Sequence, residues 1–311
     1  MGSPEAYFST KVFGAVTAIS PISGGLSGKE VFAVTTDRGE YVLHLHGPRR
    51  EMFSEIVAAQ RHAAKSGIAP VVIFADQETG AVISEKINGV SLGAVLGHSE
   101  MRSVVLGKVA ETLTLLHSIP ASDVSLADPS LGRSIWDQQS ARDGFPDWAR
   151  RMGTYVSLGE NALANDGRRV FSHNDLNPGN LLWDGSKLWM VDWERASLAH
   201  PYIDLAMFSV FAILSDNDAV KLLEKQEQGD ISDQQRITFL SILNYIRAIY
   251  GAVFFRLIPQ LTEVEFASWD DTLSLSQCYA RLAKGELNLS VPKEQALFGC
   301  AILRQAEIPP L

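Results

Sequence analysis

Short runs rich in Val, Ile, Phe and Thr alternate with turn residues over the first part of the chain. Residues 51–67 differ, because their apolar side chains recur at helical spacing and the run ends at Gly67, which is typical of a helix C-terminus. The pattern therefore predicts an antiparallel sheet accompanied by one helix. The five predicted strands are at residues 12–20, 30–37, 40–47, 70–76 and 80–87.

The pattern changes from strand to helix after residues 88–89. Residues 101–119 place apolar side chains on one helical face, and helical segments predominate from there on. Polar residues interrupt the most apolar runs, 202–214 and 239–258, so these runs predict core helices rather than membrane spans. We expect an α+β protein of two lobes, with a ligand cleft between them. The predicted divisions are a small lobe at 1–83, a hinge at 84–89 and a larger, mainly helical lobe at 90–311.

One segment places polar side chains between apolar, strand-like stretches: SHNDLNPGNLLWDG at 172–185, followed by KLWMVDWE at 187–194. Buried carboxylates are costly unless they are paired, hydrogen-bonded or bound to metal. A Pro-Gly turn lets Asp175 face Asn180, and a β-hairpin then brings Asp192 beside them. Mg²⁺ prefers such oxygen ligands, and a base beside a metal suits phosphoryl transfer. A structural network of turn caps is the alternative interpretation.

Composition narrows the class of protein. The 311 residues are 46% hydrophobic and 20% charged, as in a folded soluble protein. The formal net charge of -9 argues against a nucleic-acid-binding surface and suits a cationic small-molecule substrate. Cys278 and Cys300 fit buried thiols in a reducing compartment. With no secretory pattern or membrane span recognised, we expect a cytoplasmic protein without a membrane partner.

Several motifs occur in a set order and together resemble one family. HNDLNPGN is similar to the HxDxxxxN catalytic loop of the aminoglycoside phosphotransferase and choline kinase superfamily, relatives of protein kinases. VDWE resembles that family's metal-binding motif, slightly closer to the choline/ethanolamine-kinase-like branch, and PYIDLA resembles its DLA helix start. ISEKINGVSL (83–92) and TLTLLHSI (112–119) are similar to its inter-lobe linker and to the segment before its catalytic loop.

The resemblance implies a two-lobed protein-kinase-like fold, with the five-stranded antiparallel sheet in an N-terminal nucleotide-binding lobe. It also implies ATP- and Mg²⁺-dependent transfer of phosphate to a hydroxyl. Asp175 would accept or orient the proton of that hydroxyl, while Asn180 and Asp192 would bind Mg²⁺. His173 would brace the loop. Asp204 would hydrogen-bond the catalytic-loop backbone, with a helix N-cap as the alternative.

The same resemblance implies nucleotide contacts in the smaller lobe. Backbone groups of Ser84, Glu85 and Ile87 would pair with the adenine edge. Glu55 lies in the first helix, where the family places an acid that pairs with a third-strand Lys. Glu194, directly after the metal motif, is either an exposed acid at the end of the hairpin or a contact to metal or to a cationic substrate.

The Gly-rich segment at 23–28 does not fit a phosphate-binding loop of the GxxxxGK[ST] type. The first required Gly is replaced by Ser23, and Glu30 stands where a hydroxyl should follow Lys29. A Gly-rich flap over phosphate fits better, with Ser27 and Lys29 as candidate contacts. An ordinary hairpin turn is the alternative.

The third strand departs from the family. Val42, His44 and His46 share one face by strand alternation, and His44 stands where the family has Lys or Arg. His44 is a weaker, pH-dependent phosphate anchor, or Lys29 or an Arg supplies the charge instead. The remaining interpretation is a catalytically weak or silent pseudokinase that binds nucleotide for regulation.

The phosphate acceptor is the least determined part of the prediction. Aromatic and acidic residues at 135–160 and 240–285 favour a cationic amino-alcohol, choline- or ethanolamine-like, or an aminoglycoside, although such aromatics also form ordinary cores. A zinc hydrolase built from His44, His46, His173 and Asp175 is disfavoured, because few other histidines remain to complete its site.

Overall fold

The computed structural model describes residues 3–22, 30–47, 52–120, 124–256, 258 and 273–306. The chain forms two compact units. The first comprises Met1–Leu126 and Val170–Leu198, and the second comprises Ala127–Arg169 and Ala199–Leu311. The motif segment 170–198 thus belongs to the same unit as the N-terminal sheet. The lobe boundary at 84–89 stays a prediction.

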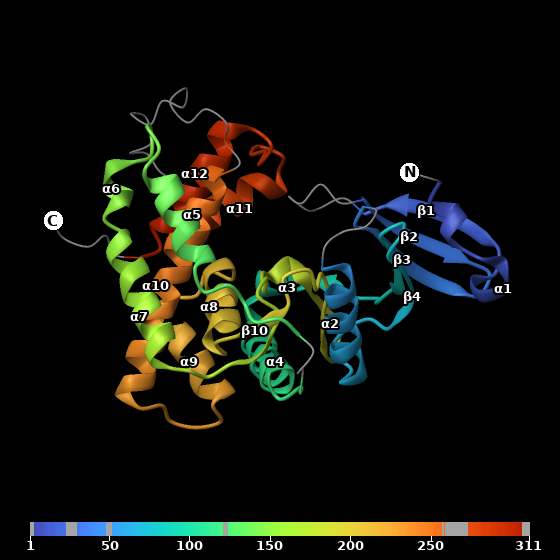
Figure 1. The fold of residues 1–311 in the computed structure, drawn as a ribbon, viewed down its shortest axis with the longest axis horizontal. Helices are drawn as coiled ribbons and strands as arrows, with labels where there is room; N and C mark the ends of the chain where they lie inside the picture. Colours follow the sequence, from blue (N-terminus) through green and yellow to red (C-terminus); the bar gives the residue numbers. More distant parts are fainter. Residues whose placement is uncertain are drawn as a thin grey trace. The chain divides into compact units, whose positions relative to one another are not determined.

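A five-stranded antiparallel sheet dominates the first unit, as the sequence pattern predicts (Figure 1). One of its faces carries the buried side chains of Val34, Leu43 and Ile83, which pack with Phe8 and Phe13 from the preceding segment. The strand order is β1-β2-β3-β5-β4, with β1 at Val16–Pro21, β2 at Glu30–Thr36, β3 at Gly39–Leu45, β4 at Val72–Asp76 and β5 at Ala81–Glu85.

The predicted first strand begins too early. Thr10–Phe13 forms a short helix, α1, preceded by a 3₁₀ turn, η1, at Pro4–Tyr7. Gly14 ends α1 with a φ of 79°, a left-handed conformation that Gly adopts without strain. The strand β1 starts only after this break, at Val16.

Helix α2, Phe53–Lys65, corresponds to the predicted first helix. Its buried Phe53 and Val57 pack against Val82 of β5. Val82 is paired in register with His44 of β3, whereas the neighbouring Leu43 belongs to the cluster formed with Phe8 and Phe13. Because side chains alternate along a strand, His44 lies on the α2 face of the sheet.

The rest of the first unit carries the motif segment. A small sheet has the order β6-β8-β9, and its β8-β9 pair is the predicted hairpin. The Met190 N–H donates to the Ile68 carbonyl at 2.7 Å, so the hairpin is fixed to the loop after α2. The elements are β6 (Val90–Ser91), α3 (Leu92–Leu96), α4 (Ser99–His117), β7 (Val170–Ser172), η2 (Pro178–Asn180), β8 (Leu181–Trp183), β9 (Leu188–Met190) and β10 (Ser197–Ala199).

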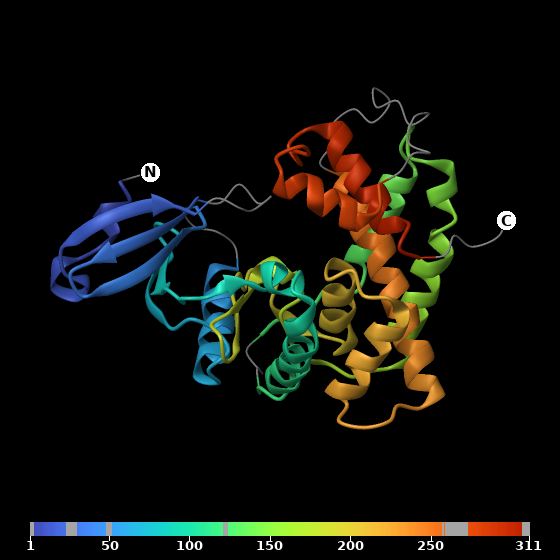
Figure 2. The same ribbon diagram turned by 180° about the vertical axis from the view of Figure 1, so that it is seen from behind.

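The second unit is helical and is built around α10, Asp233–Arg256 (Figure 2). Among the described residues, α10 alone is long and apolar enough to pass a test for a membrane span, and 61% of its most apolar window is buried. It packs against α5, α7, α8 and α12, as expected for a core helix. The other helices are α5 (Leu131–Ser140), α6 (Asp147–Arg150), α7 (Gly153–Asn165), α8 (Tyr202–Phe211), α9 (Asp216–Gln226), α11 (Leu275–Ala283) and α12 (Pro292–Leu303).

Candidate active site

The loop between β7 and η2 brings Asp175 and Asn180 together. The Nδ2 group of Asn180 donates to the Asp175 carbonyl at 2.8 Å and to its Oδ2 atom at 3.2 Å. Asn177 caps η2 by accepting from the Gly179 N–H at 2.9 Å, which fixes the tight turn between them. The predicted pairing of Asp175 and Asn180 across a Pro-Gly turn is therefore present.

His173 links the predicted catalytic loop, residues 173–180, to the segment that carries Asp192. Its ring is fully buried, and its Nε2 atom lies 3.0 Å from the Val191 carbonyl. The Asp175 N–H donates to its Nδ1 atom at 3.3 Å, so Nε2 carries the proton and donates to Val191. This geometry fits the bracing role predicted for His173.

Asp192 has a left-handed backbone, with a φ of 66°. Strand β9 ends at Met190, before this residue, so it is shorter than the strand at 188–193 that the sequence predicts. A left-handed backbone costs roughly 1–2 kcal/mol for an L-residue and persists where its surroundings impose it. Here the Val191 N–H donates to the Asn180 carbonyl at 3.0 Å, and the buried Trp193 indole donates to Met190 at 3.1 Å.

These residues fit a Mg²⁺ site. The Asn180 side chain uses its nitrogen, Nδ2, for the bond to Asp175. Its oxygen, Oδ1, takes no part in that bond, and oxygen is the ligand atom that Mg²⁺ prefers. Asp192 follows Val191, whose N–H is bonded to Asn180. No cluster of three His, Cys, Asp or Glu side chains suited to a metal occurs in the described parts of the chain. Such a site would therefore rely on these two side chains together with oxygens from ligand or water.

Glu194 is held by His46. The His46 Nδ1 atom lies 2.6 Å from the Glu194 Oε1 atom, and the two side chains are only 5% and 12% exposed. The predicted exposed acid at the end of the hairpin is therefore wrong. A role of Glu194 in contacting metal or substrate stays a prediction, and sequence reasoning did not anticipate this pair.

The geometry tests only part of the prediction for the sheet residues expected to face the nucleotide. Val42 and His44 are half-buried, and the His44 ring stacks on His46 with centroids 6.0 Å apart. Glu55 of α2 pairs with the Ser125 hydroxyl. Ser27 and Lys29 lie outside the described residues, so their phosphate contacts stay predictions.

Within the part of the chain that the structure describes, one backbone N–H of the predicted adenine-binding segment makes no hydrogen bond. The Glu85 N–H donates to Val71 and the Lys86 N–H to Glu40, at 3.0 and 3.2 Å. The Ile87 N–H makes no hydrogen bond within the described residues. Ser84 is buried inside β5, so Ile87 is the best placed of the three predicted residues to donate to a base.

Asp204 belongs to the second unit, where it is fully buried in the first turn of α8. The alternative prediction of a helix N-cap is wrong, because Pro201 occupies that position. Its predicted bond to the catalytic loop stays a prediction.

Two of the aromatics proposed to line the acceptor pocket, Trp136 and Tyr245, are core residues of the second unit, whereas Trp148, Tyr155 and Tyr250 are half-buried. Trp136 is 3% exposed and packs edge-on against Phe145. Tyr245 is 7% exposed, and burial raises its pKa to about 12. Trp148 stacks under Arg304 at 4.6 Å. Trp269 and the acids at 270 and 271 lie outside the described residues.

The second unit also contains a buried polar network that sequence reasoning missed. The His200 Nδ1 atom accepts from the Tyr202 N–H at 3.1 Å, and its Nε2 atom lies 3.1 Å from Asp166. Burial lowers the pKa of His200, and hydrogen bonds from Arg168 hold the pKa of Asp166 well below its usual range. The network spans sequence positions 166–202, which is why no local pattern revealed it.

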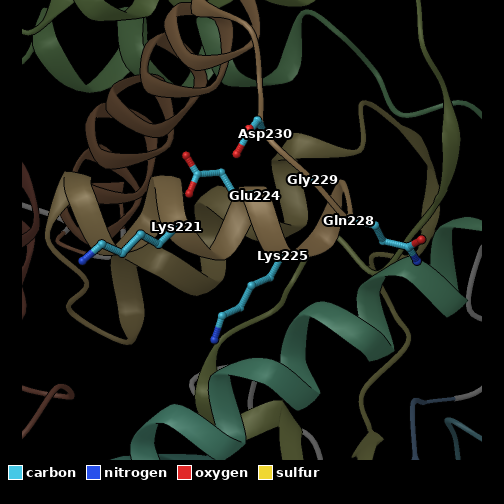
Figure 3. A pocket seen from close by; sticks show the side chains of 6 residues that line it. All are labelled: Lys221, Glu224, Lys225, Gln228, Gly229 and Asp230. Carbon is cyan, nitrogen blue, oxygen red and sulfur yellow. The ribbon is translucent and has the colours of Figure 1, made fainter.

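Figure 3 shows a surface pocket on α9 and the turn that follows it. Lys221, Glu224, Lys225 and Asp230 line it with charges of both signs. None of the predicted site residues lies there, so this pocket has no part in the chemistry considered above.

Known proteins share the sequence pattern and the fold. The model of the phosphotransferase enzyme family (APH) matches residues 18–240, more than half of the chain. N-acetylmuramate/N-acetylglucosamine kinase of Caulobacter vibrioides is 24% identical over 257 residues, covering 70% of this chain and 68% of that protein. Acyl-CoA dehydrogenase family member 11 of Pongo abelii is 27% identical over 120 residues. That match covers 35% of this chain and only 15% of the length of the acyl-CoA dehydrogenase relative.

Solved structures are similar to this chain in fold over more than nine tenths of its length. A choline/ethanolamine kinase family protein of Mesorhizobium loti has a TM-score of 0.66 at 19% identity, with 93% of each chain covered. Spectinomycin phosphotransferase APH(9)-Ia, solved with ADP and spectinomycin, has a TM-score of 0.59 at 13% identity, with 96% of each covered. At such identities the likeness establishes the fold alone, which confirms the predicted kinase-like α+β class. By the match of its sequence to the family model, the chain belongs to the phosphotransferase enzyme family.

Proposed function

We propose that the chain is an ATP- and Mg²⁺-dependent phosphotransferase that transfers the γ-phosphate to a hydroxyl of a small molecule. The observation that carries this proposal is the contact of Asn180 with Asp175, to which the Asn180–Val191 backbone bond adds Asp192. A base and two oxygen ligands on one short segment are the parts that phosphoryl transfer requires. The ADP complex of the spectinomycin phosphotransferase supports nucleotide as the phosphate donor.

Asp175 is the proposed base. Its Oδ2 atom accepts from Asn180, and its Oδ1 atom has no hydrogen-bond partner among the described residues. Oδ1 is therefore available to accept the proton of an acceptor hydroxyl, while Asn180 keeps the carboxylate oriented. His173 fixes the backbone on both sides of this contact.

Asn180 and Asp192 are the proposed holders of Mg²⁺, which would neutralise charge on the phosphate oxygens. The backbone N–H of Ile87 would donate to the adenine edge. His44 on the sheet, with Lys29, would take the place of the family's Lys as a phosphate contact.

The acceptor is a small polar molecule that carries a hydroxyl. Choline, ethanolamine and aminoglycosides are candidates through the solved structures of similar fold. N-acetylated amino sugars are a second candidate class, because the Caulobacter sugar kinase matches over 70% of this chain. Burial of Trp136 and Tyr245 removes these two side chains as contacts for a cation, and leaves the half-buried Trp148, Tyr155 and Tyr250 as candidates.

The test is ADP formation by the purified chain with MgATP and a panel of amino-alcohols, aminoglycosides and amino sugars. We expect acceptor-dependent turnover that Asp175→Asn abolishes. Turnover that survives in Asp175→Asn would contradict the assignment of the base. MgATP should also raise the melting temperature, because a ligand that binds only the native state stabilises it.

A silent, regulatory pseudokinase is the alternative outcome of the same experiment. It would show MgATP-dependent stabilisation without turnover on any acceptor. His44→Lys decides why: we expect ATP affinity to be retained or increased, because Lys restores a permanent charge on that face. A large loss of affinity would show that His44 makes a specific contact that Lys cannot replace.

A further inference from the structure

Two residues 148 positions apart form a nearly buried contact in the first unit. The His46 Nδ1 atom and the Glu194 Oε1 atom are 2.6 Å apart, which is a short hydrogen bond from imidazole to carboxylate. His46 follows the last residue of β3, and Glu194 lies two residues after Asp192. The contact therefore connects the rigid sheet directly to the segment that carries the proposed metal ligand.

His46 is itself firmly placed. Its N–H donates to the Gly80 carbonyl at 2.9 Å, and its ring stacks on His44 and meets the edge of Phe53, with centroids 6.0 and 6.2 Å apart. Gly80 and Gly47 approach so closely that a Cβ on Gly80 would lie 1.9 Å from the Gly47 oxygen. The imidazole is thus a fixed point at the end of the sheet and not a mobile surface side chain.

Asp192 needs restraint on both sides, because its φ of 66° is unfavourable for an L-residue. On the N-terminal side, Val191 is bonded to Asn180 and to His173, both in the catalytic loop. On the C-terminal side, Glu194 is bonded to His46. Of these three bonds, only the one from Glu194 to His46 connects the Asp192 segment to the N-terminal sheet. The chain is therefore restrained on both sides of Asp192, by the catalytic loop before it and by the sheet after it.

We propose that His46 is a positioning residue for the Asp192 segment, acting through Glu194. The proposal rests on the proposed function, since Asp192 is a metal ligand only within it. Loss of a group that hydrogen-bonds directly to a metal ligand typically lowers metal affinity by about 10–100-fold. His46 acts one step further away, through Glu194, so its effect should lie at the lower end of that range. Here the sheet residue fixes the segment, while the metal is held by Asn180 and Asp192.

The first test uses the ligand-free protein and needs no activity. Amide hydrogen exchange is measured for the peptide that contains residues 190–197 in the wild type, His46→Ala and Glu194→Ala. We expect both variants to exchange faster in this peptide, with unchanged exchange in the helices around α10. Unchanged exchange in the 190–197 peptide would overturn the proposal.

The second test separates positioning from general stability. The Mg²⁺ concentration that half-saturates ATP binding is measured by titration calorimetry. We expect His46→Ala to raise it about 10-fold. His46→Asn and Glu194→Gln should restore most of the wild-type value, because Asn places an amide nitrogen where Nδ1 lies and Gln keeps the acceptor oxygen.

The double variant shows whether His46 acts through Glu194. If it does, His46→Ala combined with Glu194→Ala raises the Mg²⁺ requirement no further than the larger single effect. Additive effects would overturn the proposed route. His98→Ala is the matched control, because its 3.9 Å contact with Glu100 joins two exposed side chains and should leave Mg²⁺ binding unchanged.

The outcomes distinguish this inference from the proposed function. A wild type that binds no MgATP refutes the function, whereas the exchange test still reports on the restraint. A wild type that binds MgATP while His46→Ala matches it in both tests refutes the inference alone.

Discussion

The motif segment 170–198 and the helices around α10 are both buried, but they are held by different forces. In the motif segment, His173, Asn180 and Trp193 hold the chain through specific hydrogen bonds, and Asn174 and Asp192 adopt left-handed backbones. Around α10, helices approach closely because small residues face large ones, as where Gly159 of α7 meets Tyr245. In the motif segment, polar groups fix the positions of side chains. Around α10, apolar contacts between helices stabilise the fold.

This difference predicts that substitutions in the motif segment mainly reduce activity, whereas substitutions around α10 mainly reduce stability. Removing a polar group that supplies or contacts Asp175, Asn180 or Asp192 should reduce kcat more than stability, since few apolar atoms leave the core. Replacing a small residue at a helix contact around α10 with a larger one should reduce stability more than kcat, because protein interiors tolerate little extra volume.

The largest expected effect is on the proposed base. Asp175→Asn keeps the shape of the side chain and an acceptor for Asn180, but it removes the basic carboxylate. We expect kcat to fall about 10²–10⁴-fold, the usual contribution of a positioned base, with little change in melting temperature. Steady-state kinetics and thermal unfolding measure the two quantities.

Asp184→Asn is the matched control for that substitution. Asp184 lies at the turn of the same hairpin, where it accepts from the Ser186 and Lys187 N–H groups and from Trp189. Those bonds, led by the one from Lys187, hold its pKa below its usual range. We expect kcat to be retained, and a loss equal to that of Asp175→Asn would break the proposed contrast.

Gly159→Ala tests the packing side of the comparison. A Cβ at position 159 would lie 2.2 Å from the Tyr245 Cβ atom, so α7 and α10 must move apart. We expect a loss of about 1–3 kcal/mol in the free energy of unfolding, measured by urea denaturation. Gly107→Ala in α4 is the control, because nothing lies within 4 Å of the added Cβ, and it should stabilise by roughly 0.5–1 kcal/mol.

Acid should weaken the second unit through its buried network. The folded pKa of His200 lies below its usual 6.5, so the unfolded chain binds more protons, and the His200 contribution is complete above pH 6.5. It is lost as pH falls through the lower folded pKa, and the Asp166 contribution is lost at still lower pH, below 3.8. His200→Asn keeps the acceptor for Tyr202 and removes the titration, so its unfolding free energy should fall less steeply from pH 6.5 downwards. An unchanged slope would show that His200 does not titrate there.

The smallest expected effect is on an exposed ion pair. Lys108 and Glu111 of α4 are 2.7 Å apart, with side chains 37% and 66% exposed. Lys108→Ala should change the free energy of unfolding by only about 0.2–0.5 kcal/mol and leave kcat unchanged. The measurement is urea denaturation. A change above that range would show that exposed ion pairs contribute substantially to the stability of this protein.

Local patterns predicted the sheet, helix α2 and the motif hairpin, because strand alternation, helical spacing and turn residues act over a few positions. The same reasoning failed at residues 12–13, where apolar side chains read as a strand although Gly14 ends a short helix there. It also extended β9 through Asp192, whose left-handed backbone no local pattern reveals. The aromatics of the second unit were ambiguous for a related reason, since the same residue types form cores and pockets.

Short-range spacing in the sequence was enough to predict the family, which the family match confirms, and to nominate Asp175, Asn180 and Asp192 as site residues. The groups that hold these three side chains in place could be identified only from the three-dimensional fold. His46 and Glu194 lie 148 positions apart, and Asp166 and His200 are separated along the chain by the whole motif segment 170–198. Contacts between distant positions depend on how whole elements pack, and that packing leaves no periodic trace in the residues that make them.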